Sequence, residues 1–419
     1  MKLLIRSAQV LDPKSTFNNS QVDILIDNGK IVKIDSEIME VDVEVFEAQG
    51  SIVSPGWIDM RAIFYDPGEE HKEDLDTGRE AAAAAGFTQT MLLPNTKPVV
   101  DNKGAISYIR KQSKHSLVDL LPCAAVSLKA EGKELTEMLD LEAAGAVAFS
   151  DGLNPIWHTD IMLKSLQYLQ KFNGLLINRP EDKMLTAFGH MNEGVVSTGL
   201  GLKGMPILAE SVMIERDLKL LEYAGGRLHF STISSKESVE LIKAAKKKGL
   251  NVTCDVGVNY LKFTDQDLET YDTNYKVNPP YRSEEDRSAL IEGVLDGTID
   301  IIVSDHNPHD EESKKLEFDL ADFGTNNLQG FWPIINEVFG SDLEKVVSSF
   351  TSNPREVLGL GEVSIEEGKT ANLTIFDKDS EWTFDKHSNR SRSEYSPHYQ
   401  SQLQGRVRAV INNDQIQKF

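Results

Sequence analysis

The spacing of hydrophobic and polar positions changes twice along the chain. Short apolar or alternating runs fill the first fifty residues, with turn residues such as Asn28-Gly29 between them, as is typical of β-strands. The last fifty residues contain two similar runs. We therefore expect strands at both ends of the chain, at 3–10, 22–26, 31–34, 41–48, 371–376 and 405–411.

The middle of the chain has a different pattern, in which apolar runs of strand length alternate with segments of helical periodicity. We expect strands at 88–93, 175–177, 227–233, 251–256 and 299–304, and helices at 77–85, 213–223, 238–248 and 286–295. This alternation indicates an α/β fold with a parallel sheet. About 300 residues of it without a Gly-rich phosphate loop favour a closed (β/α)8 barrel, a TIM-like fold, over a dinucleotide-binding fold.

These two patterns predict two structural units. Residues 55–361 would form the barrel, since such a barrel takes about 250 residues and the chain has 419. Residues 1–54 and 362–419 would pair into one small β-sandwich module beside it. The polar tract 388–396, rich in Ser and Arg, is interpreted as a surface loop.

Composition narrows the classes of partner. Lys plus Arg number 44 and Asp plus Glu 66, so the net charge of -22 disfavours binding to nucleic acid or to anionic membranes. A small anionic substrate is still compatible, because a pocket can be locally positive.

Cys123 and Cys254 lie in apolar runs and are interpreted as buried thiols. No signal peptide or membrane span is evident, so we expect a cytoplasmic protein.

Several sequence blocks carry a resemblance to one enzyme family. In order along the chain they are 54–60 (SPGWIDM), 91–98 (MLLPNTKP), 204–210 (GMPILAE) with 228–229 (LH), 276–282 (KVNPPYR), 304–309 (SDHNPH) and 367–373 (EGKTANL). The first resembles the segment that opens the barrel in the amidohydrolase superfamily. The others resemble, in the same order, the MPNTxP loop, the approach to the sixth strand, and the KVNPPLR, TDHAPH and GxxADL blocks of dihydroorotases. The chain is thus similar to cyclic amidohydrolases of the dihydroorotase type over nearly its whole length.

The resemblance implies a metal centre, usually of zinc, which activates water and polarises a ring carbonyl. Four histidines would hold the metals at the C-terminal ends of barrel strands, together with Asp151 and Asp305. Asp305 would also be the catalytic residue that shuttles the proton. This sequence has no histidine at any of the four positions, which are occupied by Arg61, Ile63, Arg179 and Thr232.

Those replacements predict that the chain holds no zinc and needs no other cofactor. Arginine stays protonated and isoleucine has no donor atom, so neither ligates a metal. Among the nine histidines, His229 lies three residues before Thr232 and points to the other face of its strand. We expect Arg61 and Arg179 to form ion pairs with Asp151 and Asp305, in place of the metals.

Part of the substrate pocket of the family is present in the sequence. An arginine that would anchor the substrate carboxylate is replaced by Tyr65. The family positions that remain, and that the resemblance assigns to substrate binding, are Asn95, Asn278, His309, Phe323 and Gly324. For Asn95 and Asn278, a purely structural role beside proline is an open alternative.

Three functions fit this pattern. The first is a non-catalytic dihydroorotase homologue of pyrimidine biosynthesis, in a homo- or hetero-oligomer, since inactive chains of this type assemble with aspartate carbamoyltransferase in bacteria. The second is an active cyclic amidohydrolase with a metal-free site, using Asp305 and His309 as acid and base. The third is a zinc enzyme with ligands at other positions. The landmarks Pro55-Gly56, Asp59 and Pro67-Gly68 argue against it, because they align the first strand without a gap.

Overall fold

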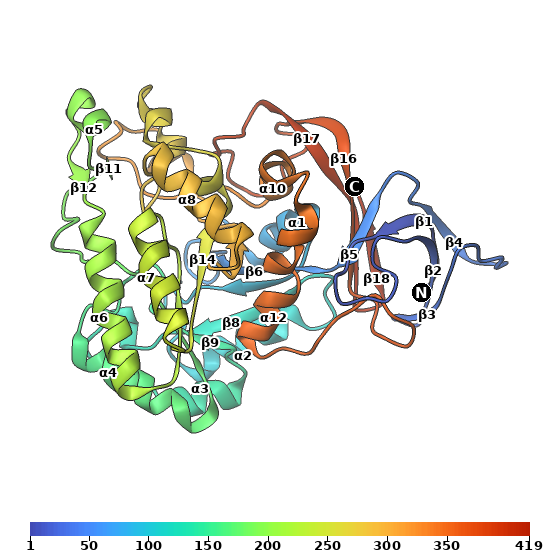
Figure 1. Ribbon diagram of the computed structural model, residues 1–419, viewed down its shortest axis with the longest axis horizontal. Coiled ribbons are helices and arrows are strands. Elements are labelled where there is room, and N and C mark those ends of the chain that lie inside the picture. The colour runs from blue at the N-terminus through green and yellow to red at the C-terminus, as the bar shows by residue number, and fades with distance from the viewer.

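The computed structural model describes all residues, 1–419, and its centre is a barrel of eight parallel strands (Figure 1). The strand order is β15-β14-β13-β10-β9-β8-β7-β6. The barrel closes between its first and last strands, where Ala62 bridges His306 in parallel. In chain order the strands are β6 (Trp57–Ala62), β7 (Phe87–Leu92), β8 (Asp119–Ala124), β9 (Ala148–Phe149), β10 (Leu175–Asn178), β13 (Arg227–Phe230), β14 (Val252–Gly257) and β15 (Ile301–Val303).

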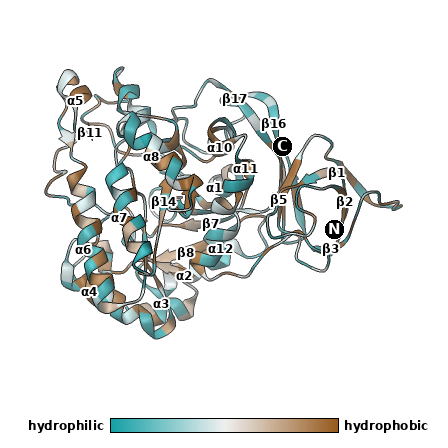
Figure 2. Cartoon of the chain, in the orientation of Figure 1, coloured by the Kyte–Doolittle hydropathy of each residue, from teal (hydrophilic) through white to brown (hydrophobic).

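Helices follow most of the strands and cover the outside of the barrel (Figure 1). Figure 2 shows that these helices carry both hydrophobic and hydrophilic residues, as expected for helices with one face on a core. They are α1 (Leu75–Ala84), α2 (Lys103–Ser113), α3 (Met138–Ala144), α4 (Thr159–Leu169), α6 (Leu208–Ala224), α7 (Lys236–Lys247), α8 (Glu284–Leu295), α10 (Phe331–Phe339), α11 (Leu343–Val346) and α12 (Ser352–Leu358).

Local sequence explains where these elements begin. Every residue of β6 is buried, as in a parallel strand covered on both faces. Asp74 caps α1 by accepting hydrogen bonds from the backbone N–H groups of Asp76 and Thr77, and Ser283 caps α8 in the same way. The expected (β/α)8 barrel is therefore confirmed.

The two ends of the chain form a second sheet, at the right of Figure 1. Its order is β18-β17-β16-β5-β1-β2-β3, and β4 also pairs with β1. The strands are β1 (Lys2–Val10), β2 (Gln21–Asp27), β3 (Lys30–Asp35), β4 (Glu44–Glu47), β5 (Ile52–Pro55), β16 (Leu373–Phe384), β17 (Ser401–Asn412) and β18 (Gln415–Lys418). A separate apolar core of 18 buried residues supports this module, as expected from the sequence.

The chain passes between the two sheets twice. Strand β5 of the module ends at Pro55 and β6 of the barrel begins at Trp57. On the return, α12 ends at Leu358 and β16 begins at Leu373. The exact division of the chain after residues 54 and 361 remains a prediction.

Several features of the fold were not expected. Strand β16 runs eight residues past the expected end at 376, and β18 was not foreseen. A segment after β10 leaves the barrel and forms a short parallel pair, β11 (Met191–Asn192) and β12 (Gly204–Met205), with α5 (Val195–Leu200) between them.

No helix combines the length and the apolar character that crossing a membrane requires.

Candidate functional site

One end of the barrel collects the residues that the sequence singled out. Each lies at or directly after the C-terminal end of a barrel strand, which is where active sites of this fold are built. They are Arg61 and Ile63 at β6, Asp151 after β9, Arg179 after β10, Thr232 after β13 and Asp305 after β15. The structure therefore brings together all six positions of the expected metal centre.

Arg61 and Asp305 form a buried ion pair at this end. The Arg61 Nε atom lies 2.7 Å from Oδ1 of Asp305, and the two side chains are only 2% and 12% exposed. Nη1 of Arg61 lies 3.3 Å from both the carbonyl oxygen and the hydroxyl oxygen of Ser231. Burial raises the pKa of the Asp305 carboxyl above its ordinary value, although the Arg61 charge opposes that shift. The expected ion pair of Arg61 with an aspartate of the metal centre is therefore confirmed.

The prediction that Arg179 pairs with an aspartate of the metal centre is wrong. Nη2 of Arg179 lies 2.9 Å from Oε2 of Glu181, and no ion pair joins Arg179 to either aspartate. Asp151 instead accepts hydrogen bonds from the backbone N–H groups of Val126 and Ser127, at 3.0 and 2.9 Å, and from the Ser127 hydroxyl, at 2.6 Å. Asp151 therefore needs no guanidinium partner, because its oxygens are already satisfied by neutral donors.

The donor set at these strand ends does not fit a zinc ion. Zinc sites in proteins use three or four Cys, His, Asp or Glu ligands, and nowhere in the chain do three such side chains meet in that way. Ile63 packs with Tyr65 and Leu93 in a small apolar cluster. The Arg61 guanidinium, a fixed positive charge, contacts Asp305, one of the two acidic positions that remain.

Asn95 and Asn278 both contact other parts of the barrel mouth. Asn95 donates to the carbonyl oxygen of Asp151 at 3.0 Å and accepts from the N–H of Leu153 at 2.9 Å. Asn278 donates to Glu181 over 3.4 Å. The Asn95 amide thus holds the loop after β9, and substrate binding by these two residues stays a prediction.

His309, Phe323 and Gly324 also lie together. Nε2 of His309 is 2.9 Å from the carbonyl oxygen of Phe323, and burial lowers the pKa of His309 to about 4. The imidazole is therefore neutral at pH 7. Gly324 has φ +133°, and an added Cβ would lie 2.5 Å from Nδ2 of Asn307. Tyr65, at the lost arginine position, donates its hydroxyl hydrogen to Asn307. Charged groups lie close by: Nζ of Lys72 is 4.9 Å from the centre of the Tyr65 ring, and Oδ2 of Asp322 is 3.7 Å from Nδ1 of His309.

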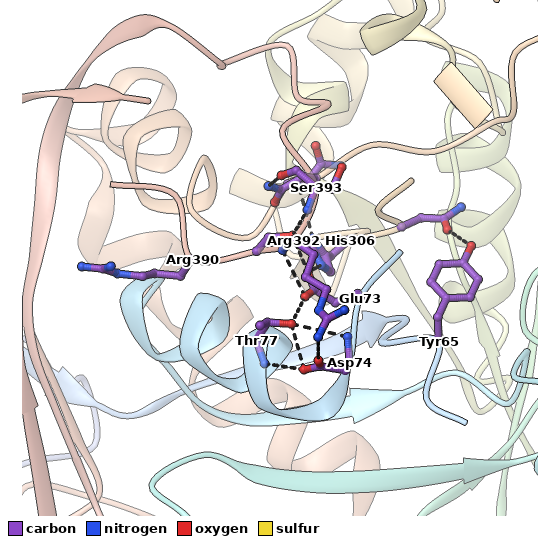
Figure 3. A network of polar contacts seen from close by, with 12 residues as sticks. Tyr65, Glu73, Asp74, Thr77, His306, Arg390, Arg392 and Ser393 are labelled. Atoms are coloured by element: carbon purple, nitrogen blue, oxygen red, sulfur yellow. Dashed lines mark hydrogen bonds and ion pairs between the residues drawn. The ribbon is translucent and has the colours of Figure 1, made fainter. Parts of the chain in front are cut away.

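A buried polar network that sequence reasoning missed covers the same end of the barrel (Figure 3). Glu73, fully buried, accepts hydrogen bonds from the hydroxyls of Thr77 and Ser391 and from the N–H of Arg392. Nε2 of His306 lies 3.5 Å from Oε2 of Glu73. The network joins the start of α1 to the loop 388–396.

The loop 388–396 lies at the surface as its composition predicted, with Arg390, Arg392 and Glu394 exposed, but its serines face inward. It has no helix or strand, but Ser391, Ser393 and Ser396 are each less than a tenth exposed. The Ser393 hydroxyl donates to the carbonyl oxygen of His309 at 2.7 Å. Its serines turn inward because they supply donors to buried acceptors, and no local sequence signal reveals that. Only the start of α1 was recognisable, since Asp74 and Thr77 have capping-box spacing.

Little open space remains at the strand ends around Arg179. The cavity lined by Arg179, Thr232 and Asn278 has a volume of about 10 Å³. That is close to the space that one water molecule needs. A six-membered ring does not fit this cavity as it stands.

Comparison with known proteins connects this site to a family. The sequence model described as Dihydro-orotase-like matches residues 50–238. The dihydroorotases of Syntrophotalea carbinolica and Aquifex aeolicus are each 37% identical, over 99% of this chain and 99% of their own length. That of Pelotomaculum thermopropionicum is 42% identical over 90% of each chain. The chain belongs to the dihydroorotase family.

Solved structures agree with the dihydroorotase-family fold. An L-hydantoinase (dihydropyrimidinase) from Arthrobacter aurescens superposes with a TM-score of 0.86 at 24% identity, covering 99% of this chain and 95% of its own. A D-hydantoinase from Thermus sp. gives 0.83 at 20% identity, covering 99% and 94%. These identities show the fold alone: a barrel with a β module beside it.

Proposed function

We propose that the chain is a non-catalytic member of the dihydroorotase family. The observation that carries this proposal is the buried pair of Arg61 and Asp305, at a site with no imidazole at the four histidine positions of the family. Hydrolysis of a cyclic amide needs an activated water and a group that stabilises the oxyanion, and metals supply both in this family. Asp305, paired with a permanent cation, is poorly placed to accept a proton from water.

For the biological role, we propose structural or regulatory support of aspartate carbamoyltransferase in pyrimidine biosynthesis, in the cytoplasm. Such a role requires the fold and its surfaces rather than metal ligands. An intact barrel and module support this role, with losses at the four histidine positions and at the substrate-anchoring arginine, where the chain has Tyr65. Copurification of tagged full-length chain with the carbamoyltransferase of the same organism tests it, and a clean failure to copurify at low salt would remove the proposal.

A second candidate is an active cyclic amidohydrolase without metal. The raised pKa of Asp305 favours it, since perturbed carboxyls in clefts often act as general bases. His309 gives it little help, because a pKa of about 4 makes the imidazole a weak base and its Nε2 contacts a backbone carbonyl.

One experiment separates the two candidates. The chain and the Aquifex aeolicus dihydroorotase, as control, are purified without chelator, assayed for zinc and then for dihydroorotate hydrolysis with zinc added. We expect less than one zinc per chain and no turnover. Turnover that persists in chelator would favour the metal-free enzyme, and turnover with stoichiometric zinc would refute both candidates.

A further inference from the structure

An apolar surface lies on the side of the barrel away from the terminal module, around α6 and the segment after β10 at the left of Figure 1. Six large hydrophobic residues are exposed there, and we call them the α6 patch: Trp157, Met184, Leu185, Phe188, Leu208 and Val212. Single exposed hydrophobic residues are ordinary on protein surfaces, whereas a contiguous group of them marks an interaction site.

One face of α6 forms the middle of the patch. Leu208 and Val212 are four residues apart on the helix, so their side chains lie on the same face. Trp157 borders this face, because its carbonyl oxygen accepts a hydrogen bond of 2.7 Å from Nη1 of Arg216, one turn beyond Val212. These three hydrophobic residues are therefore neighbours on the surface.

The segment after β10 extends the patch beyond the start of α6. The N–H of Asp182 donates to the carbonyl oxygen of Ala209 at 2.9 Å. This bond places Met184 and Leu185 beside the first turn of the helix. Met184 is 85% exposed, so it covers no other part of the chain closely.

Phe188 lies at the tip of the same segment in an unfavourable backbone conformation. Its φ is +62°, in the left-handed region where a bulky residue is rare. The turn packs closely on Met205, three residues before Leu208, since a Cβ added at Gly189 would lie 2.3 Å from Cγ of Met205. Phe188 is also 85% exposed, so burial within the chain does not offset the strain. A contact outside the chain would offset it.

The size of the patch fits one half of a protein interface. The exposed fractions of its six residues correspond to roughly 700 Å² of surface. The largest apolar patch on a monomer usually measures about 300–600 Å². Each partner in a complex of standard size contributes about 800 Å². The α6 patch is therefore large enough to form the apolar centre of a stable interface.

The charge around the patch indicates what can bind there. The segment 183–219 has four basic and four acidic residues, so its net charge is zero and the whole net charge of -22 lies outside it. The eight residues are Lys183, Lys203, Arg216, Lys219, Glu193, Glu210, Glu215 and Asp217. A second copy of this acidic chain can therefore approach the patch without the repulsion that it meets elsewhere.

A second exposed apolar pair gives the contrast. Met39 and Val41 of the terminal module are 87% and 79% exposed, but Glu37, Glu40 and Asp42 lie beside them in the sequence. Two copies that met at this pair would bring like charges together. Exposed hydrophobic residues alone thus do not make a surface for self-association.

We infer that the α6 patch binds the same patch of a second copy of this chain, in a homodimer with twofold symmetry. A twofold axis brings identical surfaces together, so an apolar centre with balanced charges around it can complement itself. Glu215 and Lys219, exposed on α6 beyond Val212, belong to the polar rim of such an interface. The inference does not depend on whether the chain is catalytic.

Sedimentation velocity of the full chain tests the inference, over chain concentrations from about 1 to about 100 µM. We expect a dimer at about 10 µM. Met184→Glu places a carboxylate on both sides of the twofold interface and should weaken dimerisation by about a hundredfold or more. Met39→Glu is the matched control, because it makes the same substitution at an equally exposed methionine and should change the Kd of the dimer by less than about threefold.

A wild-type chain that stays monomeric at about 100 µM would overturn the inference, and so would a dimer that Met184→Glu leaves intact. If the wild type forms a larger assembly, Met184→Glu should reduce its mass, and an unchanged mass counts against the inference. Should Met184→Glu fail to fold, Phe188→Glu takes its place. A monomer that copurifies with aspartate carbamoyltransferase only while Met184 is present would assign the patch to that partner and refute the homodimer.

Discussion

Removing the Arg61 side-chain charge should destabilise the barrel strongly. Arg61→Met keeps much of the side-chain volume but leaves Asp305 buried without its cation, and breaking a buried ion pair costs about 3–5 kcal/mol. Asp305 is 12% exposed, so partial hydration favours the lower value. A barrel of about 300 residues unfolds with an entropy of about 0.6 kcal/mol/K, so about 3 kcal/mol lowers the midpoint by about 5 °C.

The pH dependence gives a second test of the same pair. Without Arg61, the pKa of Asp305 rises further above its unfolded value. A carboxyl with a raised folded pKa penalises the folded state above the unfolded pKa, and the penalty is relieved as pH falls. The difference between Arg61→Met and the wild type should therefore shrink between pH 7 and pH 4.

Thermal unfolding followed by circular dichroism measures both effects, with two further variants. Lys243→Ala removes an exposed ion pair to Asp296, with side chains 47% and 42% exposed, and should cost less than about 1 kcal/mol. Arg61→Met combined with Asp305→Leu should recover most of the loss, because an apolar pair leaves no buried charge. A midpoint for Arg61→Met no lower than that of Lys243→Ala would refute the reasoning.

Three further predictions concern other parts of the barrel. Burial raises the pKa of Asp59 to about 7, so the folded state loses stability as pH rises from about 4 to 7; Asp59→Asn should flatten that slope in unfolding midpoints, and parallel curves would contradict this. Glu73→Gln removes one of the carboxylate oxygens that accept hydrogen bonds from the loop 388–396. Trypsin should therefore cleave that loop several times faster than in the wild type, and an unchanged digestion pattern would contradict this. Gly324→Ala adds a clash to a left-handed backbone and should cost more than Gly249→Ala, where φ is +80° and the space is open; equal midpoints would disprove the clash.

The barrel was predictable because its strands have a simple chemical requirement. Strands buried on both faces are mostly apolar, so their runs stand out from the amphipathic helices. The predicted ends of the elements were less accurate. Strand β16, for example, continues beyond its apolar part as a partly exposed strand. The residues of β11, α5 and β12 are too few to show any period.

Contacts at the candidate site were predictable only within strands, where the alternation of side chains fixes the direction in which each one points. Arg61 lies within β6 and points into the barrel, so its contact with Asp305 followed from the alternation of side chains. Arg179 lies after β10 ends, where no period applies, and the nearby Glu181 competes for it. The partners of Asp151 include backbone N–H groups, which any sequence supplies, so residue types alone do not reveal them.

The pairing of β5 with β16 has a consequence for how the chain folds. Ile52 to Pro55 pair antiparallel with Leu373 to Phe376, across more than three hundred intervening residues. During synthesis the early strands therefore emerge long before their partners, and one edge of β5 stays unpaired while the whole barrel is being made. Contacts so distant along the chain slow folding, and an open strand edge invites pairing with other chains. We expect the module to close last, so a chain that ends before residue 373 would carry the barrel beside a sheet with an unpaired strand edge.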